Sequence, residues 1–332
     1  MSAFAAQGTS ASDPWLTVVI PTYNGGRYLR STLASIERER PVGIEIIAVD
    51  DGSSDATMDI LTSSARTLPI RLVRGPGRAG WVGATNIGAR EARGTWLCML
   101  HQDDLWLPGR LRSLQHTSSH NPHAGLLVGE SEFLDESGRR IGRWRLPWHG
   151  TPPQPTEMAR RLYVQNWLAL PSCAVKTNLL KALNYLDEDL WYTADWDLWL
   201  RLVRDAPIAI AHGVLSGFRI HGSSQTVERS ADIGAFESQM RTVQERHRWA
   251  ADGRSDVLAA GEMSTLTNVA LASLLHRGRF PASALARQAL RLRGGGWRRF
   301  ARDSRIVDRA GPRIRLAVRS RSAAAWPIST TT

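Results

Sequence analysis

Short apolar runs alternate with amphipathic stretches along the first hundred residues of the chain. Residues 16–20 form an apolar, β-branched run that ends at Pro21, which predicts a buried strand. Runs of the same kind follow at 44–49, 70–73 and 95–100, and the stretches between them place apolar residues at helical spacing. Continuous apolar strands that alternate with amphipathic helices are typical of a parallel sheet covered on both faces. The first hundred residues therefore predict an α/β fold.

The pattern is looser after Pro108. We expect a strand near 124–128, a hairpin over 132–144, and strands near 208–211 and 215–220. From Ile233 onward the spacing of apolar residues is helical. The predicted organisation is a flexible N-terminus at 1–14, an α/β domain at 15–228 with halves at 15–107 and 108–228, and a helical, basic extension at 229–332.

Pairs of carboxylates stand at the predicted ends of two strands. Asp50 and Asp51 follow one strand, and Asp103 and Asp104 follow another. Ligands of open α/β sheets bind beyond the carboxyl ends of the strands, so the four acids are expected on one edge. Adjacent carboxylates repel each other, and a divalent cation with oxygen ligands relieves that repulsion. The alternatives are that Asp103 and Asp104 cap the helix after Pro108, and that Asp50 and Asp51 cap a turn.

Residues 75–80 match the glycine pattern G-x-G-x-x-G between a strand and a helix. The dinucleotide fingerprint belongs in the first strand–helix turn, which here reads PTYNGG, and it needs an acidic residue about 20 positions further on. That position is near His101. We therefore interpret 75–80 as a loop whose amides approach phosphate, and not as a dinucleotide site.

The net charge of +11 is concentrated in the tail. Fourteen arginines and two aspartates follow His276, so residues 1–276 are close to neutral and a nucleic-acid partner is not expected. Cys98 and Cys173 are interpreted as buried thiols of a cytoplasmic protein. We expect neither a signal peptide nor a membrane span. The tail mixes arginine with apolar residues at helical spacing, which favours either an anionic membrane surface or a helix packed on the domain.

Five blocks occur in order: VVIPTYNGG (18–26), IIAVDDGSSD (46–55), MLHQDDLWLPGRL (99–111), TADWDLWLRL (193–202) and FRIHGSSQT (218–226). Together they resemble the family 2 glycosyltransferases of the GT-A fold. The resemblance implies a Rossmann-like, mostly parallel sheet with helices on both faces, followed by the helical C-terminal extension. It also implies transfer of a sugar from a nucleotide diphosphate sugar, with inversion, to a glycan or lipid-linked acceptor.

The resemblance assigns roles to individual residues. The donor is expected to contact Pro21, Tyr23, Asn24, Asp51, Arg78, Asn86 and Asp103. Mg²⁺ or Mn²⁺ is expected on Asp103, Asp104 and His221. In the family the first acid of the metal motif often stands where this chain has His101, so His101 either orients the site or is a strand-end histidine with satisfied hydrogen bonds. His221 and Arg219 also remain open between a ligand role and a structural one.

Asp195 matches the family's general base, which takes the proton of the acceptor hydroxyl. Ala194 replaces the Glu that usually precedes it, and Asp197 is interpreted as structural. The predicted role is cell-surface polysaccharide or glycolipid synthesis in the cytoplasm, with possible peripheral attachment to the inner face of the membrane. Two alternatives remain: a sugar-nucleotide nucleotidyltransferase, and a nucleic-acid-binding protein that uses the basic tail.

Overall fold

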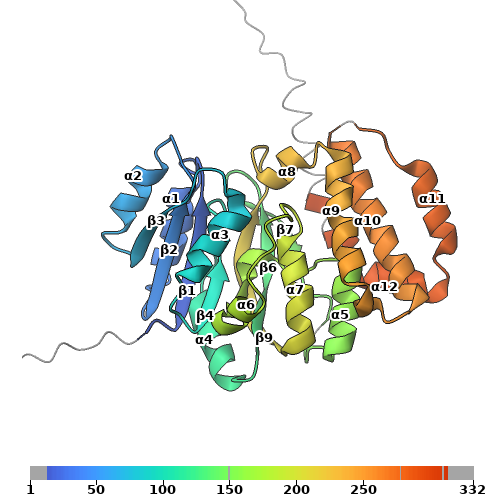
Figure 1. Cartoon of the computed structure of the whole chain (residues 1–332), viewed down its shortest axis with the longest axis horizontal. Helices are drawn as coiled ribbons and strands as arrows, with labels where there is room; N and C mark the ends of the chain where they lie inside the picture. Colours follow the sequence, from blue (N-terminus) through green and yellow to red (C-terminus); the bar gives the residue numbers. More distant parts are fainter. Residues whose placement is uncertain (1–12, 149, 277, 309, 313–332) are drawn as a thin grey trace, which may run out of the picture.

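A nine-stranded sheet runs through the protein, and helices cover both of its faces (Figure 1). The computed structural model describes residues 13–148, 150–276, 278–308 and 310–312. Most of the predicted flexible N-terminus and residues 313–332 of the predicted basic extension lie outside these ranges. The strand order is β3-β2-β1-β4-β8-β6-β9-β5, and β7 pairs with β6.

The first half of the sheet contains the four predicted parallel strands. Their bounds are β1 (Leu16–Thr22), β2 (Ile44–Asp50), β3 (Ile70–Arg74) and β4 (Trp96–Met99). Between them lie α1 (Leu29–Glu37), α2 (Thr57–Ser64) and α3 (Gly80–Arg90). β1 continues through Pro21 instead of ending there. Its pairing with β4 stops at Val19 and Met99, so the missing N–H of Pro21 breaks no hydrogen bond of that pair.

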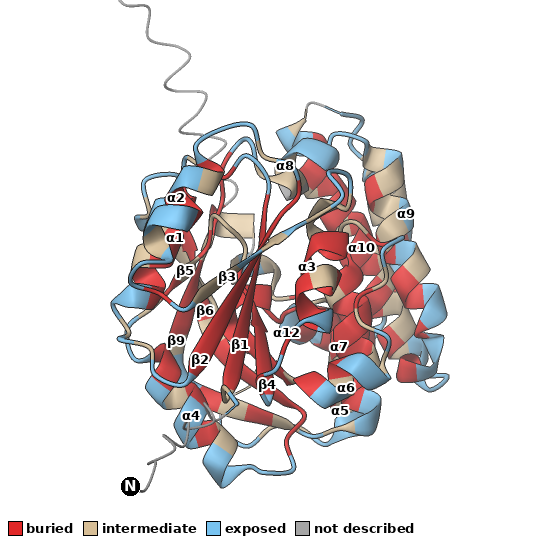
Figure 2. Ribbon diagram, turned by 60° about the vertical axis from the view of Figure 1, so that its left-hand side comes forward, coloured by how far each residue is buried: buried red, intermediate tan, exposed pale blue. Residues whose placement is uncertain are grey.

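The two faces of β1 contribute to two separate layers of the core. Val18 and Ile20 pack with Leu33 of α1, whereas Val19 packs with Val82 of α3. Every residue of β1 and β2 is buried, because helices cover both faces of these strands (Figure 2). Gly88 brings α3 close to the sheet, since an added Cβ would lie 2.6 Å from Val19 Cγ1. The predicted α/β architecture is therefore confirmed.

The second half of the sheet is mixed. Its strands are β5 (Leu105–Trp106), β6 (Leu126–Leu134), β7 (Arg140–Trp144), β8 (Cys173–Lys176) and β9 (Ile208–Arg219), and its helices are α4 (Arg110–His120), α5 (Pro155–Val164), α6 (Thr177–Ala182) and α7 (Ala194–Asp205). β8 lies antiparallel between β4 and β6, whereas β6 and β9 are parallel. The β6–β7 hairpin is confirmed, and Gly138 adopts a φ of +82° in its turn. The two strands predicted over 208–220 are one continuous strand, β9.

The C-terminal helices share the core of the sheet domain. They are α8 (Gln225–Arg229), α9 (Ile233–Arg246), α10 (Ser255–Leu275), α11 (Ala282–Arg291) and α12 (Gly294–Asp303). Met240 of α9 and Ala260 of α10 belong to the same hydrophobic cluster as Leu198 of α7. Figure 1 shows α9, α10, α11 and α12 beyond α5 and α7. The predicted helical extension is thus present and packs against the half of the sheet domain at 108–228.

α10 is long and apolar enough to cross a membrane by length and composition, which the sequence did not lead us to expect. However, 67% of its apolar window is buried inside the protein. Ala260, Leu266 and Val269 are among its buried residues. This burial is the pattern of a core helix, because the surface that lipid would contact is occupied by neighbouring helices.

Candidate functional site

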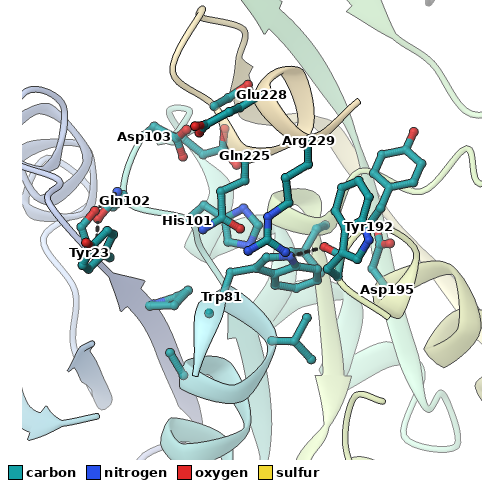
Figure 3. A pocket seen from close by; sticks show the side chains of 18 of the residues that line it. Tyr23, Trp81, His101, Gln102, Asp103, Tyr192, Asp195, Gln225, Glu228 and Arg229 are labelled. Carbon is teal, nitrogen blue, oxygen red and sulfur yellow. Dashed lines mark hydrogen bonds between the residues drawn. The ribbon is translucent and has the colours of Figure 1, made fainter. Parts of the chain in front are cut away.

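One cavity of about 950 Å³ opens at the carboxyl ends of β1, β2 and β4 and extends to α7 and α10. Of the residues predicted for the site, nine line it: Pro21, Tyr23, Asn24, Asp51, Arg78, Asp103, Asp104, Asp195 and His221. Figure 3 shows Tyr23 and Gln102 on one side of the cavity, Tyr192 and Asp195 on the other, and His101 between them. Residues from all five sequence blocks therefore face one space.

Asn86 is the exception among the predicted residues. It is 1% exposed and is not part of the cavity lining. Its Nδ2 atom donates to the Leu186 carbonyl and to Glu188, both at 2.9 Å, and its Oδ1 atom accepts from Leu186 N–H. These three bonds use its side chain to hold the segment at 186–188, so the expected donor contact is corrected to a structural role.

The carboxylate of Asp51 organises the glycine-rich loop. It accepts hydrogen bonds from the Gly77 and Gly80 amides at 2.9 and 3.0 Å. These bonds hold residues 77–80 against the end of β2 and present Arg78 to the cavity. Asp50, in contrast, accepts hydrogen bonds from the amide and the hydroxyl of Ser53 within its own turn. The turn-capping alternative therefore describes Asp50, whereas Asp51 reaches the cavity wall.

The end of β1 is tied directly to the acidic turn. Tyr23 N–H donates to Gln102 Oε1, and Gln102 Nε2 donates back to the Tyr23 carbonyl, both at 2.9 Å. Asn24 adopts a φ of +47° and accepts a hydrogen bond from Ser54 N–H. The Tyr23 side chain is half exposed. This pairing fixes the distance between the end of β1 and the turn at 101–104.

The two acids of the turn have different surroundings. Asp103 Oδ2 lies 2.7 Å from His221 Nε2. Burial acts to raise the pKa of Asp103, but the His221 hydrogen bond and the nearby imidazoles outweigh it, so its pKa lies below the ordinary value. Asp104 is 1% exposed, and both burial and the charge of Asp103 raise its pKa well above the ordinary value. Its Oδ1 atom accepts a hydrogen bond from Arg219 N–H.

Arg219 links the end of β9 to the acidic turn. Its Nε atom donates to the Asp103 carbonyl at 2.7 Å, and its Nη1 atom donates to the Glu136 carbonyl at 3.0 Å. These bonds are to backbone oxygens. The structural alternative for Arg219 is therefore supported, and its neighbour His221 is brought to Asp103 as a consequence.

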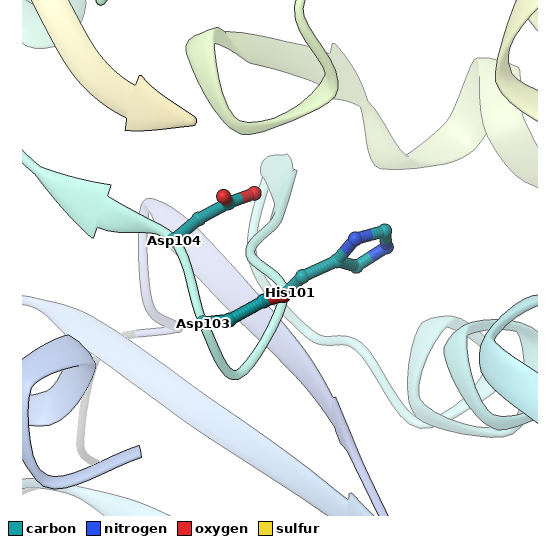
Figure 4. A group of neighbouring side chains, drawn as sticks. All are labelled: His101, Asp103 and Asp104. Atoms are coloured by element: carbon teal, nitrogen blue, oxygen red, sulfur yellow. The ribbon is translucent and has the colours of Figure 1, made fainter. Parts of the chain in front are cut away.

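His101, Asp103 and Asp104 form a group that is able to hold a metal ion (Figure 4). One donor atom from each lies within 4.8 Å of the other two. His101 Nε2 and Asp104 Oδ2 are buried without a hydrogen-bond partner among the described residues. His101 is thus not a histidine with satisfied hydrogen bonds, as one alternative held. An imidazole nitrogen and a carboxylate oxygen that both lack a hydrogen-bond partner, beside the ionised Asp103, are suited to bind a divalent cation.

Asp195 lies at the start of α7 in an apolar setting. Its Oδ1 atom accepts from Trp196 N–H at 2.8 Å and its Oδ2 atom from Asn166 Nδ2 at 2.9 Å. Burial raises the pKa of Asp195 to about 6, although these two bonds act to lower it. Asp197 faces away, to His247 and Arg201, both at 2.8 Å. Burial acts to raise the pKa of Asp197, but these two partners outweigh it and hold the pKa below the ordinary value, which fits the structural role predicted for Asp197.

The sequence did not identify several residues that line the side of the cavity near Asp195. Asn166 precedes β8, Arg229 ends α8, and Met240 and Asn268 come from α9 and α10. None of them lies in a motif with recognisable spacing, except that Arg229 follows the block at 218–226 by three residues. Met240 and Asn268 enter the site because α10 packs against α5 and α9.

Comparison with known proteins agrees with this geometry. Residues 17–183 match the family model described as glycosyl transferase family 2. An uncharacterized glycosyltransferase of Rickettsia typhi is 26% identical over 232 residues, which is 68% of this chain and 70% of that protein. Another, from Rickettsia prowazekii, is 27% identical over 220 residues and 64% of this chain. The match spans 66% of that relative, so this chain covers about two thirds of the curated relatives' length.

Among solved structures, S. aureus TarS 1–349 in complex with UDP-GlcNAc aligns over 86% of this chain and 90% of its own, with a TM-score of 0.56 and 14% identity. At 14% identity, this similarity is evidence for a shared fold only. The family match decides between the two enzyme classes that the sequence left open, since it sets the nucleotidyltransferase aside. The chain belongs to glycosyl transferase family 2 and is a glycosyltransferase with the GT-A fold.

Proposed function

We propose that the enzyme is an inverting, metal-assisted transferase that moves a sugar from a nucleotide diphosphate sugar to an acceptor hydroxyl. The observation that carries the proposal is the cavity of about 950 Å³ that joins Asp51, Asp103 and Asp195. Asp51 lies at one end with the loop amides, and Asp195 lies across the acidic turn with the aromatic residues. The donor, its diphosphate and the acceptor would then occupy separate places along a single space.

The nucleoside would bind at the ends of β1 and β2, against Pro21, Tyr23, Asn24 and Asp51. The Asp51 oxygens each retain a lone pair beside their bonds to the loop amides, which allows them to accept from a ribose hydroxyl or a base N–H. Arg78 extends from the same loop and supplies positive charge toward the donor. TarS, which shares the fold, has been solved with UDP-GlcNAc and with UDP.

Asp103, Asp104 and His221 would hold Mg²⁺ or Mn²⁺ at the diphosphate. The orphaned Asp104 Oδ2 atom and the 2.7 Å pair of Asp103 and His221 support this assignment. A bound divalent ion supplies Lewis-acid stabilisation of the negative charge that develops on the leaving diphosphate. Asp103 contributes the ionised carboxylate, and the Tyr23–Gln102 pairing keeps the turn in place.

Asp195 would act as general base. Its pKa of about 6 means that it is ionised near neutrality and still basic enough to accept a proton from a hydroxyl that becomes acidic as it reacts. The acceptor oxygen attacks the anomeric carbon, the bond to the diphosphate breaks, and Asp195 receives the hydroxyl proton. One displacement of this kind inverts the anomeric centre.

The acceptor is proposed to be a glycan or a lipid-linked glycan in cell-surface polysaccharide or glycolipid synthesis, reached from the inner face of the membrane. The support comes from α11 and α12. Gln288 is the one buried residue of α11, whereas Leu290 and Trp297 are 84% and 42% exposed. Arg287 and Arg291 are exposed on the same helix as Leu290. Exposed apolar side chains among arginines fit an anionic lipid surface.

A screen of nucleotide sugars by thermal shift, with and without Mn²⁺, tests the donor assignment. A ligand that binds only the folded protein raises Tm, so a true donor should raise it in a Mn²⁺-dependent manner. The Asp51→Ala variant should lose the shift. A shift that is equal in wild type and Asp51→Ala would contradict the placement of the nucleoside.

A further inference from the structure

The turn between β4 and β5 carries a histidine where an acid is often found in the family. His101 Nε2 is buried and, within the described ranges, has no hydrogen-bond partner. Asp104 is 1% exposed, and its Oδ2 atom is also buried without a hydrogen-bond partner among the described residues. A buried polar atom without a partner has lost its hydrogen bonds to water and gained none in exchange, which destabilises the fold. Two such atoms in one turn indicate a shared ligand that satisfies both.

The spacing of the donor atoms restricts what that ligand is. Atoms that share one metal ion at about 2.0–2.3 Å lie no more than about 4.6 Å apart. The donors of His101, Asp103 and Asp104 lie within 4.8 Å of one another, so small side-chain movements suffice to bring them to one ion. Asp103 is also 2.7 Å from the imidazole of His221. Two imidazoles therefore flank the same carboxylate.

Both imidazoles are held in orientation by neighbours. The His101 ring packs edge-on against Trp81, with ring centroids 5.0 Å apart and an angle of 67°. Trp81 is anchored by its Nε1–H, which donates to the Trp191 carbonyl at 2.6 Å. His221 Nδ1 lies 3.0 Å from the Ser223 hydroxyl, which leaves Nε2 to face Asp103. Supporting contacts of this kind orient metal-binding histidines in proteins.

We propose that His101 is a metal ligand alongside Asp103, Asp104 and His221, and that the two imidazoles make this site select Mn²⁺ over Mg²⁺. The inference rests on the proposed metal site and specifies its ion. Mg²⁺ takes oxygen ligands almost exclusively, whereas imidazole binds first-row transition ions well. Replacing an acid by His101 thus lowers the affinity for Mg²⁺ more than that for Mn²⁺.

Mn²⁺ binding to the full chain tests the proposal without an activity assay. MnCl₂ is titrated against the protein by electron paramagnetic resonance, MgCl₂ is added as competitor, and electron spin-echo modulation reports nitrogen bound to Mn²⁺. Wild type should show two imidazole nitrogens and prefer Mn²⁺ by more than tenfold. His101→Asp should show one nitrogen, and its Mn²⁺-over-Mg²⁺ preference should fall about tenfold. His101→Gln should also show one nitrogen.

The exposed His123 provides the matched control, and His123→Asn should retain two nitrogens and the wild-type preference. Mn²⁺ binding with an unchanged nitrogen count in both His101 variants would overturn this inference alone and leave the proposed metal site intact. Failure of wild type to bind Mn²⁺ would overturn the inference and also remove the metal from the proposed function. Circular dichroism of each variant verifies that the fold is retained.

Discussion

Asn166 donates a hydrogen bond from Nδ2 to the Oδ2 atom of Asp195, at 2.9 Å. Asn166 is itself oriented by its Oδ1 atom, which accepts from Leu168 N–H. The other carboxylate oxygen of Asp195 accepts from Trp196 N–H. Asp195 is thus held by two neutral donors in a partly buried setting. This arrangement fixes the direction of the carboxylate while leaving it a stronger base than an exposed aspartate.

We expect Asp195→Asn to reduce kcat by about 10²–10⁴-fold, because general-base catalysis contributes an effect of this size. The dissociation constant of the donor, measured by calorimetry, should change little, since the donor contacts lie at the other end of the cavity. Asp197→Asn is the matched control. This variant removes the carboxylate that pairs with His247 and Arg201, so it should lower Tm while retaining most of kcat. Equal transfer rates for wild type and Asp195→Asn would exclude Asp195 as the base.

The pH dependence of kcat/KM should show an acid limb set by Asp195. Because the base must be ionised, activity is expected on a plateau above pH 6–7 and should fall about tenfold per unit below the pKa of about 6. Asn166→Ala removes a hydrogen bond that acts to lower this pKa, so its acid limb should move to higher pH. An acid limb at the same pH in both proteins would show that Asn166 does not tune the base.

The same raised pKa predicts a cost in stability at neutral pH. The folded state holds the Asp195 proton more tightly than the unfolded chain does, so the free energy of unfolding falls as pH rises from about 4 to about 6. The shift from 3.8 to about 6 corresponds to a cost of about 3 kcal/mol above pH 6, as an upper estimate. In Asp195→Asn this term is absent. Relative to wild type, the variant should therefore gain Tm between pH 4.5 and pH 7.5; a constant difference would contradict the burial of this carboxylate.

The sequence predicted the part of the fold in which each segment carries its own pattern. Strands β1, β2 and β4 are buried on both faces, and their continuous apolar runs are visible in the chain without any knowledge of partners. The carboxylates that follow them could be assigned to one edge for the same reason. β8 was not predicted, because its position between β4 and β6 depends on a crossover from distant sequence that leaves no local mark.

The acceptor side of the cavity was less accessible to sequence reasoning. Asn166, Met240 and Asn268 reach the site from three segments whose local patterns indicate only helices and loops. Asn86 was misassigned because a motif position does not reveal whether a side chain turns toward the ligand or toward the segment at 186–188. For Met240 and Asn268, the sequence did not reveal the packing of α10 against α5 and α9.

Removal of metal ligands should separate donor binding from charge stabilisation. Asp103→Ala is expected to abolish transfer and the stimulation of transfer by added Mn²⁺, because it removes the ionised carboxylate of the proposed site. Chelation of wild type with EDTA should reproduce the loss, and Mn²⁺ should restore it in wild type only. Glu136→Ala, on the exposed hairpin turn, serves as a control for the loss of a nearby acid. Full activity of wild type in EDTA would contradict a role for metal in transfer.

Binding to an anionic membrane is best tested by surface substitutions in α11. Deleting everything after Arg277 would remove Leu292 and Phe300 from the core and the Arg299 bonds to Asp256 and Glu157, so loss of folding would obscure the result. Arg287→Glu with Leu290→Asp changes exposed side chains only.

The double variant should bind vesicles containing phosphatidylglycerol at least tenfold more weakly, since each arginine near an anionic surface is worth about 1 kcal/mol and a charge reversal doubles the effect. Arg38→Glu with Val42→Asp makes equivalent changes at exposed positions on the other side of the protein and should leave vesicle binding unchanged. Sedimentation with vesicles of neutral lipid distinguishes charge attraction from apolar insertion, and equal binding by all three proteins would exclude α11 as the contact surface.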